Sequence, residues 1–297
     1  MKQAISTFLL MFLLSVLPPV NNVLAHNGIE EKKGIIHLYD KWNFVLAGLL
    51  LIIFVLSIIQ VKKGQESLKK CIYLFLALLT FYIAIGSPLH YLGDHFLFSA
   101  HMLEQSLIYI VLPPLLLLGL PNRMMEPILH LGFRYKLINF LKYPLIPLLL
   151  FNVLFSFYHV PFIFNTIVSN NILHNLTHII LTISALFMWI PLIPVTKELD
   201  RLANIQKIGY IFAAGILLTP ACALIIFANQ PFYTVYYDAP QLFKTLTPLK
   251  DQQTGGIIMK VVQEIVYGTI IGYIFFNWAK KERLKDEQLT GSFVNNL

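Results

Sequence analysis

Residues 98–121, FSAHMLEQSLIYIVLPPLLLLGLP, place polar side chains at the start of an apolar segment that is long enough to cross a lipid bilayer. A helix of ~20 residues spans the hydrocarbon core. The first turns of this segment contain His101, Glu104 and Gln105. Ionisable side chains at membrane depth are costly, so they usually face the protein interior and have a function there. We therefore predict a membrane helix whose polar end belongs to a functional site.

The composition of the whole chain indicates a membrane protein. Of the 297 residues, 57% are hydrophobic and only 12% are charged, which excludes a soluble globular domain. Seven apolar segments of about bilayer length follow one another, at 42–61, 71–86, 98–118, 144–164, 173–193, 208–228 and 256–279. The predicted fold class is all-α, a polytopic membrane bundle of seven transmembrane helices over residues 42–279.

The N-terminal residues 1–25 have the pattern of a secretory signal peptide. An early Lys2 precedes an apolar run at 4–17, and the small residues Val23 and Ala25 suit cleavage after residue 25. An uncleaved first membrane helix is the alternative. Cleavage would leave residues 26–41 as a short extracytoplasmic segment, with His26 as an N-terminal amine and imidazole that could bind copper.

The positive charges predict the orientation of the chain. The connections at 61–70, 121–142 and 194–207 and the tail at 280–297 are basic, whereas 87–95, 158–171 and 229–255 carry little positive charge. Under the positive-inside rule the N-terminus lies outside and the tail is cytoplasmic, as a signal peptide also requires. We expect a multi-pass protein of the bacterial plasma membrane. The net charge of +7 therefore indicates orientation and not nucleic-acid binding.

The histidines gather on the predicted outer side. Of nine, only His130 lies in a loop expected to be cytoplasmic; the others are His26, His37, His90, His95, His101, His159, His174 and His178. His174 and His178 are four residues apart and share one helix face, a usual way to offer two imidazoles to one metal ion. We predict that they converge with His101. A single histidine between membrane helices more often only forms hydrogen bonds.

Other polar and kink-forming residues have ordinary structural explanations. Asp94 and Asp251 in outer loops are by default helix caps or loop anchors, and Cys71 and Cys222 lie in different spans and show no disulfide or thiolate-metal pattern. The pair Pro113-Pro114 interrupts backbone hydrogen bonding and should bend its helix.

Six short motifs occur in order along the chain: SPL at 87–89, LFSAHM at 97–102, PPLLLLGLP at 113–121, HVP at 159–161, HNLTH at 174–178 and LTPLKDQQTGGIIMK at 246–260. Together they resemble the CtaG family of bacterial cytochrome c oxidase assembly factors, the seven-span type. The resemblance covers nearly the whole chain from the second span to the seventh. Many relatives carry a second histidine where this chain has Gln105.

The resemblance implies a role in forming an active caa(3)-type cytochrome c oxidase, as a metallochaperone that binds copper and passes it to an oxidase subunit. The expected metal ligands are His101, His174 and His178, with Met259, Glu104, Asp251 and His159 as accessories. The lipid bilayer is a second partner, and other copper-handling assembly proteins are further candidates. The sequence leaves homodimer formation open.

Two other functions use the same histidines. Seven-span membrane hydrolases bind zinc through three histidines and an aspartate, a role that Asp94 or Asp251 could take, and the zinc would activate a water molecule. A haem protein could use His101 and His178 as axial ligands. We favour an assembly factor over an enzyme because no general base stands beside the three histidines in sequence.

Overall fold

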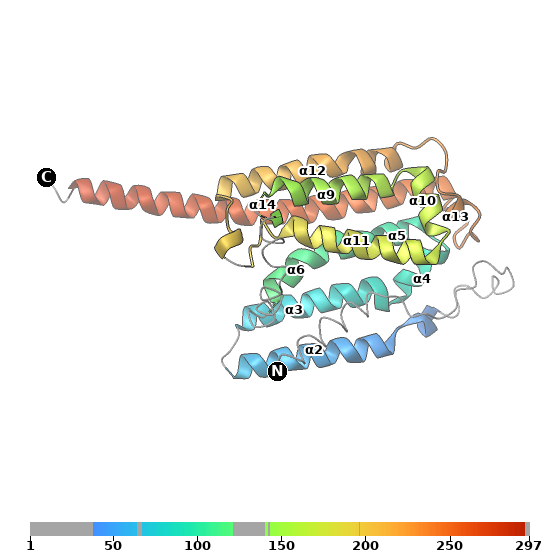
Figure 1. Cartoon of the computed structure of the whole chain (residues 1–297), viewed down its shortest axis with the longest axis horizontal. Helices are drawn as coiled ribbons and strands as arrows, with labels where there is room; N and C mark the ends of the chain where they lie inside the picture. Colours follow the sequence, from blue (N-terminus) through green and yellow to red (C-terminus); the bar gives the residue numbers. More distant parts are fainter. Residues whose placement is uncertain (1–37, 64–66, 121–139, 142, 196, 295–297) are drawn as a thin grey trace.

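The computed structural model describes residues 38–63, 67–120, 140–141, 143–195 and 197–294, and within these ranges it contains helices and connections but no β-strand. The predicted signal peptide, His26, His37 and His130 lie outside the described residues. The helices, drawn in Figure 1, are α2 (Phe44–Lys62), α3 (Leu68–Phe81), α4 (Pro88–His95), α5 (Phe98–Ser106), α6 (Leu112–Gly119), α9 (Leu145–Tyr158), α10 (Pro161–Val168), α11 (Asn171–Trp189), α12 (Asn204–Ile226), α13 (Thr234–Tyr237) and α14 (Pro248–Val294).

The described residues contain six helices long and apolar enough to cross a membrane, and a seventh if one bent helix pair counts as a span. They run roughly parallel, and the short helices α4, α10 and α13 lie together at one end of the bundle (Figure 1). We call this the α4 end. Many large apolar side chains on the bundle surface are exposed, as expected for helices that face lipid. The all-helical membrane fold is therefore confirmed.

The predicted span 144–164 differs from a simple transmembrane helix. α9 ends at Tyr158 after 14 residues, or about 21 Å, which is shorter than the hydrocarbon core. After a break the chain turns by 80° into α10. The bend occurs at Val160-Pro161 because a residue before proline avoids the helical conformation, and Val160 is extended. This bend brings α10 across the α4 end.

The proline pair of the third span changes the pitch of the helix without breaking it. Residues Leu107–Val111 form a π-helical turn between α5 and α6, and Phe98–Gly119 remains one span. The carbonyl of Tyr109 would normally bond to an N–H four or five residues later, but both positions are prolines. The Trp189 indole Nε1 donates to this carbonyl at 3.4 Å, so α11 supplies the hydrogen bond that Pro113 and Pro114 cannot donate.

Close helix packing determines the remaining geometry. α14 packs against α12 and α5, and α6 packs against α3. At the α3–α6 crossing a Cβ on Gly119 would overlap the backbone nitrogen of Leu74, so only glycine permits this approach. α2 contacts mainly α3 and lies at the edge of the bundle (Figure 1).

The last helix begins and ends beyond the predicted span 256–279. α14 begins at Pro248, because the polar residues that follow have partners: Gln252 Oε1 accepts from the Phe232 N–H at 2.7 Å, and Gln253 donates to the Ala228 carbonyl at 3.0 Å. At its other end α14 continues to Val294 and projects alone from the bundle (Figure 1). Hydropathy could not detect either extension, since both are polar.

Candidate functional site

Three histidines from two helices converge at the α4 end. The ring centre of His101 on α5 lies 5.7 Å from that of His174 and 5.6 Å from that of His178, both on α11, and the latter two lie 4.4 Å apart. His101 is only 1% exposed. We call these residues the histidine trio. The structure thus brings together the three residues that the sequence singled out.

Each imidazole of the trio has one nitrogen near a polar neighbour. His101 Nε2 lies 3.0 Å from the Tyr158 hydroxyl and 2.9 Å from Gln105 Nε2. His178 Nδ1 lies 2.6 Å from the Tyr109 hydroxyl, and His174 Nε2 lies 3.8 Å from a carboxylate oxygen of Asp94 (Oδ1). The two tyrosines could not be recognised from the sequence, because α9 and the middle of the third span meet the trio only in the folded bundle.

The other nitrogen of each ring is buried and has no hydrogen-bond partner. These atoms are His101 Nδ1, His174 Nδ1 and His178 Nε2. A buried polar atom without a partner costs about 1–3 kcal/mol, so three in one place call for a ligand. The trio is nevertheless more open than a closed metal cage, since its nitrogens do not all come within 4.8 Å of one another.

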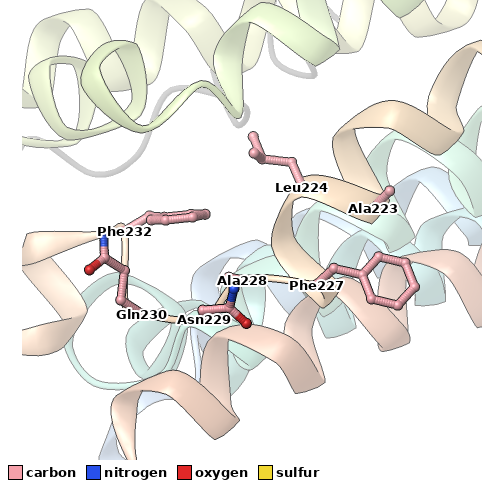
Figure 2. Close-up of a pocket in the computed structure, with 7 residues that line it drawn as sticks. All are labelled: Ala223, Leu224, Phe227, Ala228, Asn229, Gln230 and Phe232. Carbon is pink, nitrogen blue, oxygen red and sulfur yellow. The ribbon is translucent and has the colours of Figure 1, made fainter.

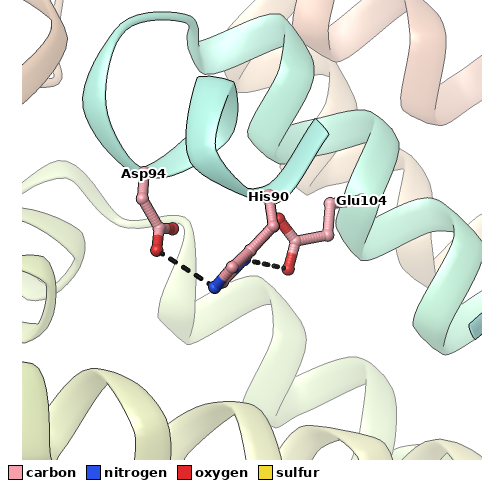
Figure 3. Close-up of side chains that lie close together, drawn as sticks. All are labelled: His90, Asp94 and Glu104. Atoms are coloured by element: carbon pink, nitrogen blue, oxygen red, sulfur yellow. Dashed lines mark hydrogen bonds and ion pairs between the residues drawn. The ribbon is translucent and has the colours of Figure 1, made fainter. Parts of the chain in front are cut away.

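A second group of ionisable side chains lies beside the trio. His90 Nδ1 is 3.1 Å from Glu104 Oε1, and His90 Nε2 is 3.4 Å from Asp94 Oδ2, so the imidazole sits between two carboxylates (Figure 3). We call His90, Asp94 and Glu104 the carboxylate cluster. Among the described residues it is the group of three whose ligand atoms lie within 4.8 Å of one another.

The charges of the carboxylate cluster reinforce each other. Burial lowers the pKa of His90, but the negative charges of Glu104 and Asp94 outweigh burial and raise this pKa to about 10. Burial raises the pKa of the Asp94 carboxyl, and the neighbouring His90 outweighs that effect and lowers it. At neutral pH His90 is therefore an imidazolium, and Asp94 carries negative charge toward the trio.

One glycine allows α4 to reach the trio. A Cβ on Gly93 would lie 3.0 Å from both the Cα and the N of His101, closer than almost any real contact. The Tyr236 hydroxyl donates to the Gly93 carbonyl at 2.8 Å and holds this part of α4 in place. The next residue, Asp94, therefore stands between His90 and His174.

The predicted accessory ligands have other roles in the structure. Glu104 belongs to the carboxylate cluster rather than the trio, because its carboxylate faces His90. Asp251 accepts hydrogen bonds from the N–H groups of Phe98 at 2.7 Å and Ser99 at 3.2 Å, so it caps α5, the default role of an outer-loop aspartate.

The other two predicted accessory ligands, Met259 and His159, lie outside the trio. Met259 is fully buried on α14, and Met102 packs toward Gly255 of the same helix. His159 Nδ1 is bonded to the Phe155 carbonyl at 2.8 Å, while its Nε2 is buried without a partner. Its ring lies 5.0 Å from that of Tyr158, so it adjoins the trio through this tyrosine.

A pocket of about 330 Å³ opens near the end of α12 (Figure 2). Its lining is mostly apolar, with side chains such as Leu224, Phe227 and Phe232, and its polar members are Asn229 and Gln230. It contains no ionisable residue. The chemistry of this end of the bundle therefore lies in the trio and the carboxylate cluster.

A family comparison covers both groups. The model of the cytochrome c oxidase caa3 assembly factor family matches residues 68–281, well over half of the chain. The chain belongs to this family. The match extends from α3 into α14 and includes every residue of the trio and the carboxylate cluster. No curated protein and no solved structure matches the chain.

Membership of the caa3 assembly factor family gives the function at a coarse level. The protein is a membrane-spanning assembly factor, and this role implies association with cytochrome c oxidase. The zinc hydrolase and haem alternatives gain no support from the family match.

Proposed function

We propose that the protein binds a copper ion with His101, His174 and His178 and passes it to a subunit of a caa3-type cytochrome c oxidase. The observation that carries the proposal is the set of three buried ring nitrogens without hydrogen-bond partners. Imidazole is a good copper ligand, and three imidazoles on two rigid helices form a donor set for one ion. In a family that assembles a copper enzyme, copper is the cargo that fits this donor set.

The neighbours of the trio support ligation. Histidines that bind metals usually have their second nitrogen held by a carboxylate, a carbonyl or water, which fixes the ring orientation. Tyr109 and Asp94 are placed to hold His178 and His174 in this way. For His101, rotation of the Gln105 amide would bring its unpartnered Oε1 to the Nε2–H, leaving the Nδ1 lone pair available.

The charge near the trio also favours a cation. Neutral imidazoles bring no negative charge, and an isolated cation in a low-dielectric interior is costly. Asp94 offsets part of this cost, because its Oδ1 lies 3.8 Å from His174. The open arrangement of the trio suits a carrier, since an ion that must be passed on should not be enclosed in a tight tetrahedral shell.

The position of the trio suits delivery on the outer side of a bacterial plasma membrane. The trio lies at the α4 end, and the loops expected to be cytoplasmic, such as Lys62-Lys63, lie at the other end of the helices. Following the positive-inside rule, we assign the α4 end to the outside. An oxidase subunit with an outer-side copper site would meet the protein there.

The test measures Cu(I) binding by purified protein in detergent under reducing conditions. The wild-type protein is compared with a His174→Ala/His178→Ala double variant. The matched control is His95→Ala, which removes an imidazole of α4 whose Nδ1 is bonded to the Tyr91 carbonyl. We expect one Cu(I) per chain in the wild type and the control, and none in the double variant.

Oxidase activity in cells gives the second measurement. The double variant should accumulate in the membrane at the wild-type level and fail to support caa3 oxidase activity, whereas His95→Ala should support it. Equal Cu(I) binding by the double variant, or none by the wild type, would refute the copper proposal. Tightly held zinc in place of copper would favour the hydrolase alternative.

A further inference from the structure

The carboxylate cluster contains more groups able to bind a metal ion than an ordinary ion pair does. His90 is held by two carboxylates, of which Glu104 is almost completely buried, with 4% side-chain exposure. Asp94 directs its second oxygen toward His174 and so borders the trio as well. The side chains of His90 and Asp94 are 30% and 28% exposed, compared with 13% for His174 of the trio, so the cluster is the more accessible of the two groups.

The dimensions of the cluster fit a metal ion. Ligand atoms bound to one ion by bonds of about 2.1 Å lie at most about 4.2 Å apart. One ligand atom from each of His90, Asp94 and Glu104 lies within 4.8 Å of the others. Three ligand atoms in a tetrahedral arrangement lie about 3.4 Å apart, so side-chain shifts on the order of 1 Å would bring all three within bonding distance of one ion.

We propose that His90, Asp94 and Glu104 form a second metal site, separate from the trio, that binds a divalent transition-metal ion such as Cu²⁺. One imidazole and two carboxylates are nitrogen and oxygen ligands that suit divalent ions, and no thiolate or thioether is present to favour Cu(I). Binding of the ion displaces the proton that His90 carries between the two carboxylates. The partial exposure of His90 and Asp94, together with the contact of Asp94 with His174, places the second site beside the trio and open to solvent.

The geometry explains why these three residues meet. Gly93 lets α4 pack directly on the backbone of His101, which brings His90 and Asp94 of α4 over Glu104, one turn further along α5. Figure 3 shows the His90 ring between the carboxylates of Asp94 and Glu104. Without this crossing, two carboxylates and an imidazole from separate helices would not share one site.

The test uses Cu²⁺ and electron paramagnetic resonance on the His174→Ala/His178→Ala protein, in which both α11 imidazoles are absent. We expect one bound Cu²⁺ per chain with a spectrum of mostly oxygen ligands and one nitrogen. Adding Glu104→Gln or, separately, Asp94→Asn should weaken Cu²⁺ binding at least ~10-fold. The control in the same background is Asp200→Asn. Asp200 precedes α12, and its carboxylate is paired with Lys207.

The outcomes separate this proposal from the proposed function. Absence of Cu²⁺ from the double variant, or equal binding after Glu104→Gln and Asp94→Asn, overturns the second site whatever the trio does with Cu(I). If the wild type binds no Cu(I) but the oxygen-rich Cu²⁺ signal is present, the trio is refuted as a copper site and the second metal site stands. Because Glu104 is buried, half-exposed Asp94 supplies the decisive variant if Glu104→Gln lowers the yield of folded protein.

Discussion

Replacing Tyr109 by phenylalanine tests whether the trio is held in place for metal binding. The hydroxyl of Tyr109 lies 2.6 Å from His178 Nδ1, and the other nitrogen of this ring already has no hydrogen-bond partner. Tyr109→Phe therefore leaves the His178 imidazole, whose Nε2 is buried, with neither nitrogen bonded. Loss of a partner beside a buried polar atom costs about 1–3 kcal/mol of folding free energy.

The same change should weaken Cu(I) binding. Removing a neighbour that orients a ligand typically lowers metal affinity 10–100-fold, or about 1.4–2.7 kcal/mol. The assay is competition with a coloured Cu(I) chelator, together with thermal unfolding in detergent. Cu(I) affinity and thermal stability should both fall in Tyr109→Phe, while the Cu(I) stoichiometry stays at one per chain.

Tyr210→Phe is the matched control. Tyr210 is also buried and donates a hydrogen bond to a carbonyl of α11, that of Met188, at 2.8 Å, but it contacts no member of the trio. We expect a modest loss of thermal stability and an unchanged Cu(I) affinity. The reasoning is refuted if the two variants lose Cu(I) affinity equally, or if Tyr109→Phe loses only stability.

Three further predictions concern positions around the site. Gly93→Ala should lower thermal stability markedly, because its Cβ would press on the His101 backbone. The control is Gly48→Ala on α2, where the added Cβ meets nothing within 4 Å and thermal stability should be unchanged. An unchanged thermal stability of Gly93→Ala would argue against the close crossing of α4 and α5. Asp251→Ala should lower the free energy of unfolding by about 0.5–2 kcal/mol, because it removes the α5 cap, and should leave the Cu(I) stoichiometry unchanged. A loss of bound Cu(I) in the folded variant would instead make Asp251 a metal ligand. Gln105→His should maintain or raise Cu(I) affinity in the chelator assay, since it adds an imidazole one turn from His101, and a clear decrease would contradict this.

The sequence predicted the broad structure because apolar length is a local property. Each span of ~20 apolar residues is visible without knowing its neighbours. The span at 144–164 shows the limit of that argument: its apolar length is sufficient, but Val160-Pro161 turns the chain by 80° into α10. The polar start of α14 was missed for the opposite reason, since Asp251 and Gln252 are stabilised by partners far away in sequence.

The site divides in the same way. The four-residue spacing of His174 and His178 placed them on one helix face, and the sequence could also assign His101 to the same end of the bundle. It could not show that Glu104, three residues after His101, faces His90 on α4 instead of the trio. It could not show either that Tyr109 and Tyr158 are beside these histidines.

The sequence by itself determined the membrane-spanning helices, the family motifs and the histidines at one end, because hydropathy and helical spacing depend on neighbouring residues alone. Only the tertiary structure separated the histidine trio from the carboxylate cluster. That division depends on how closely α4 crosses α5 at Gly93, and on the contacts of Tyr158 with His101 and of Tyr109 with His178. Such contacts join different helices, and packing in three dimensions decides them.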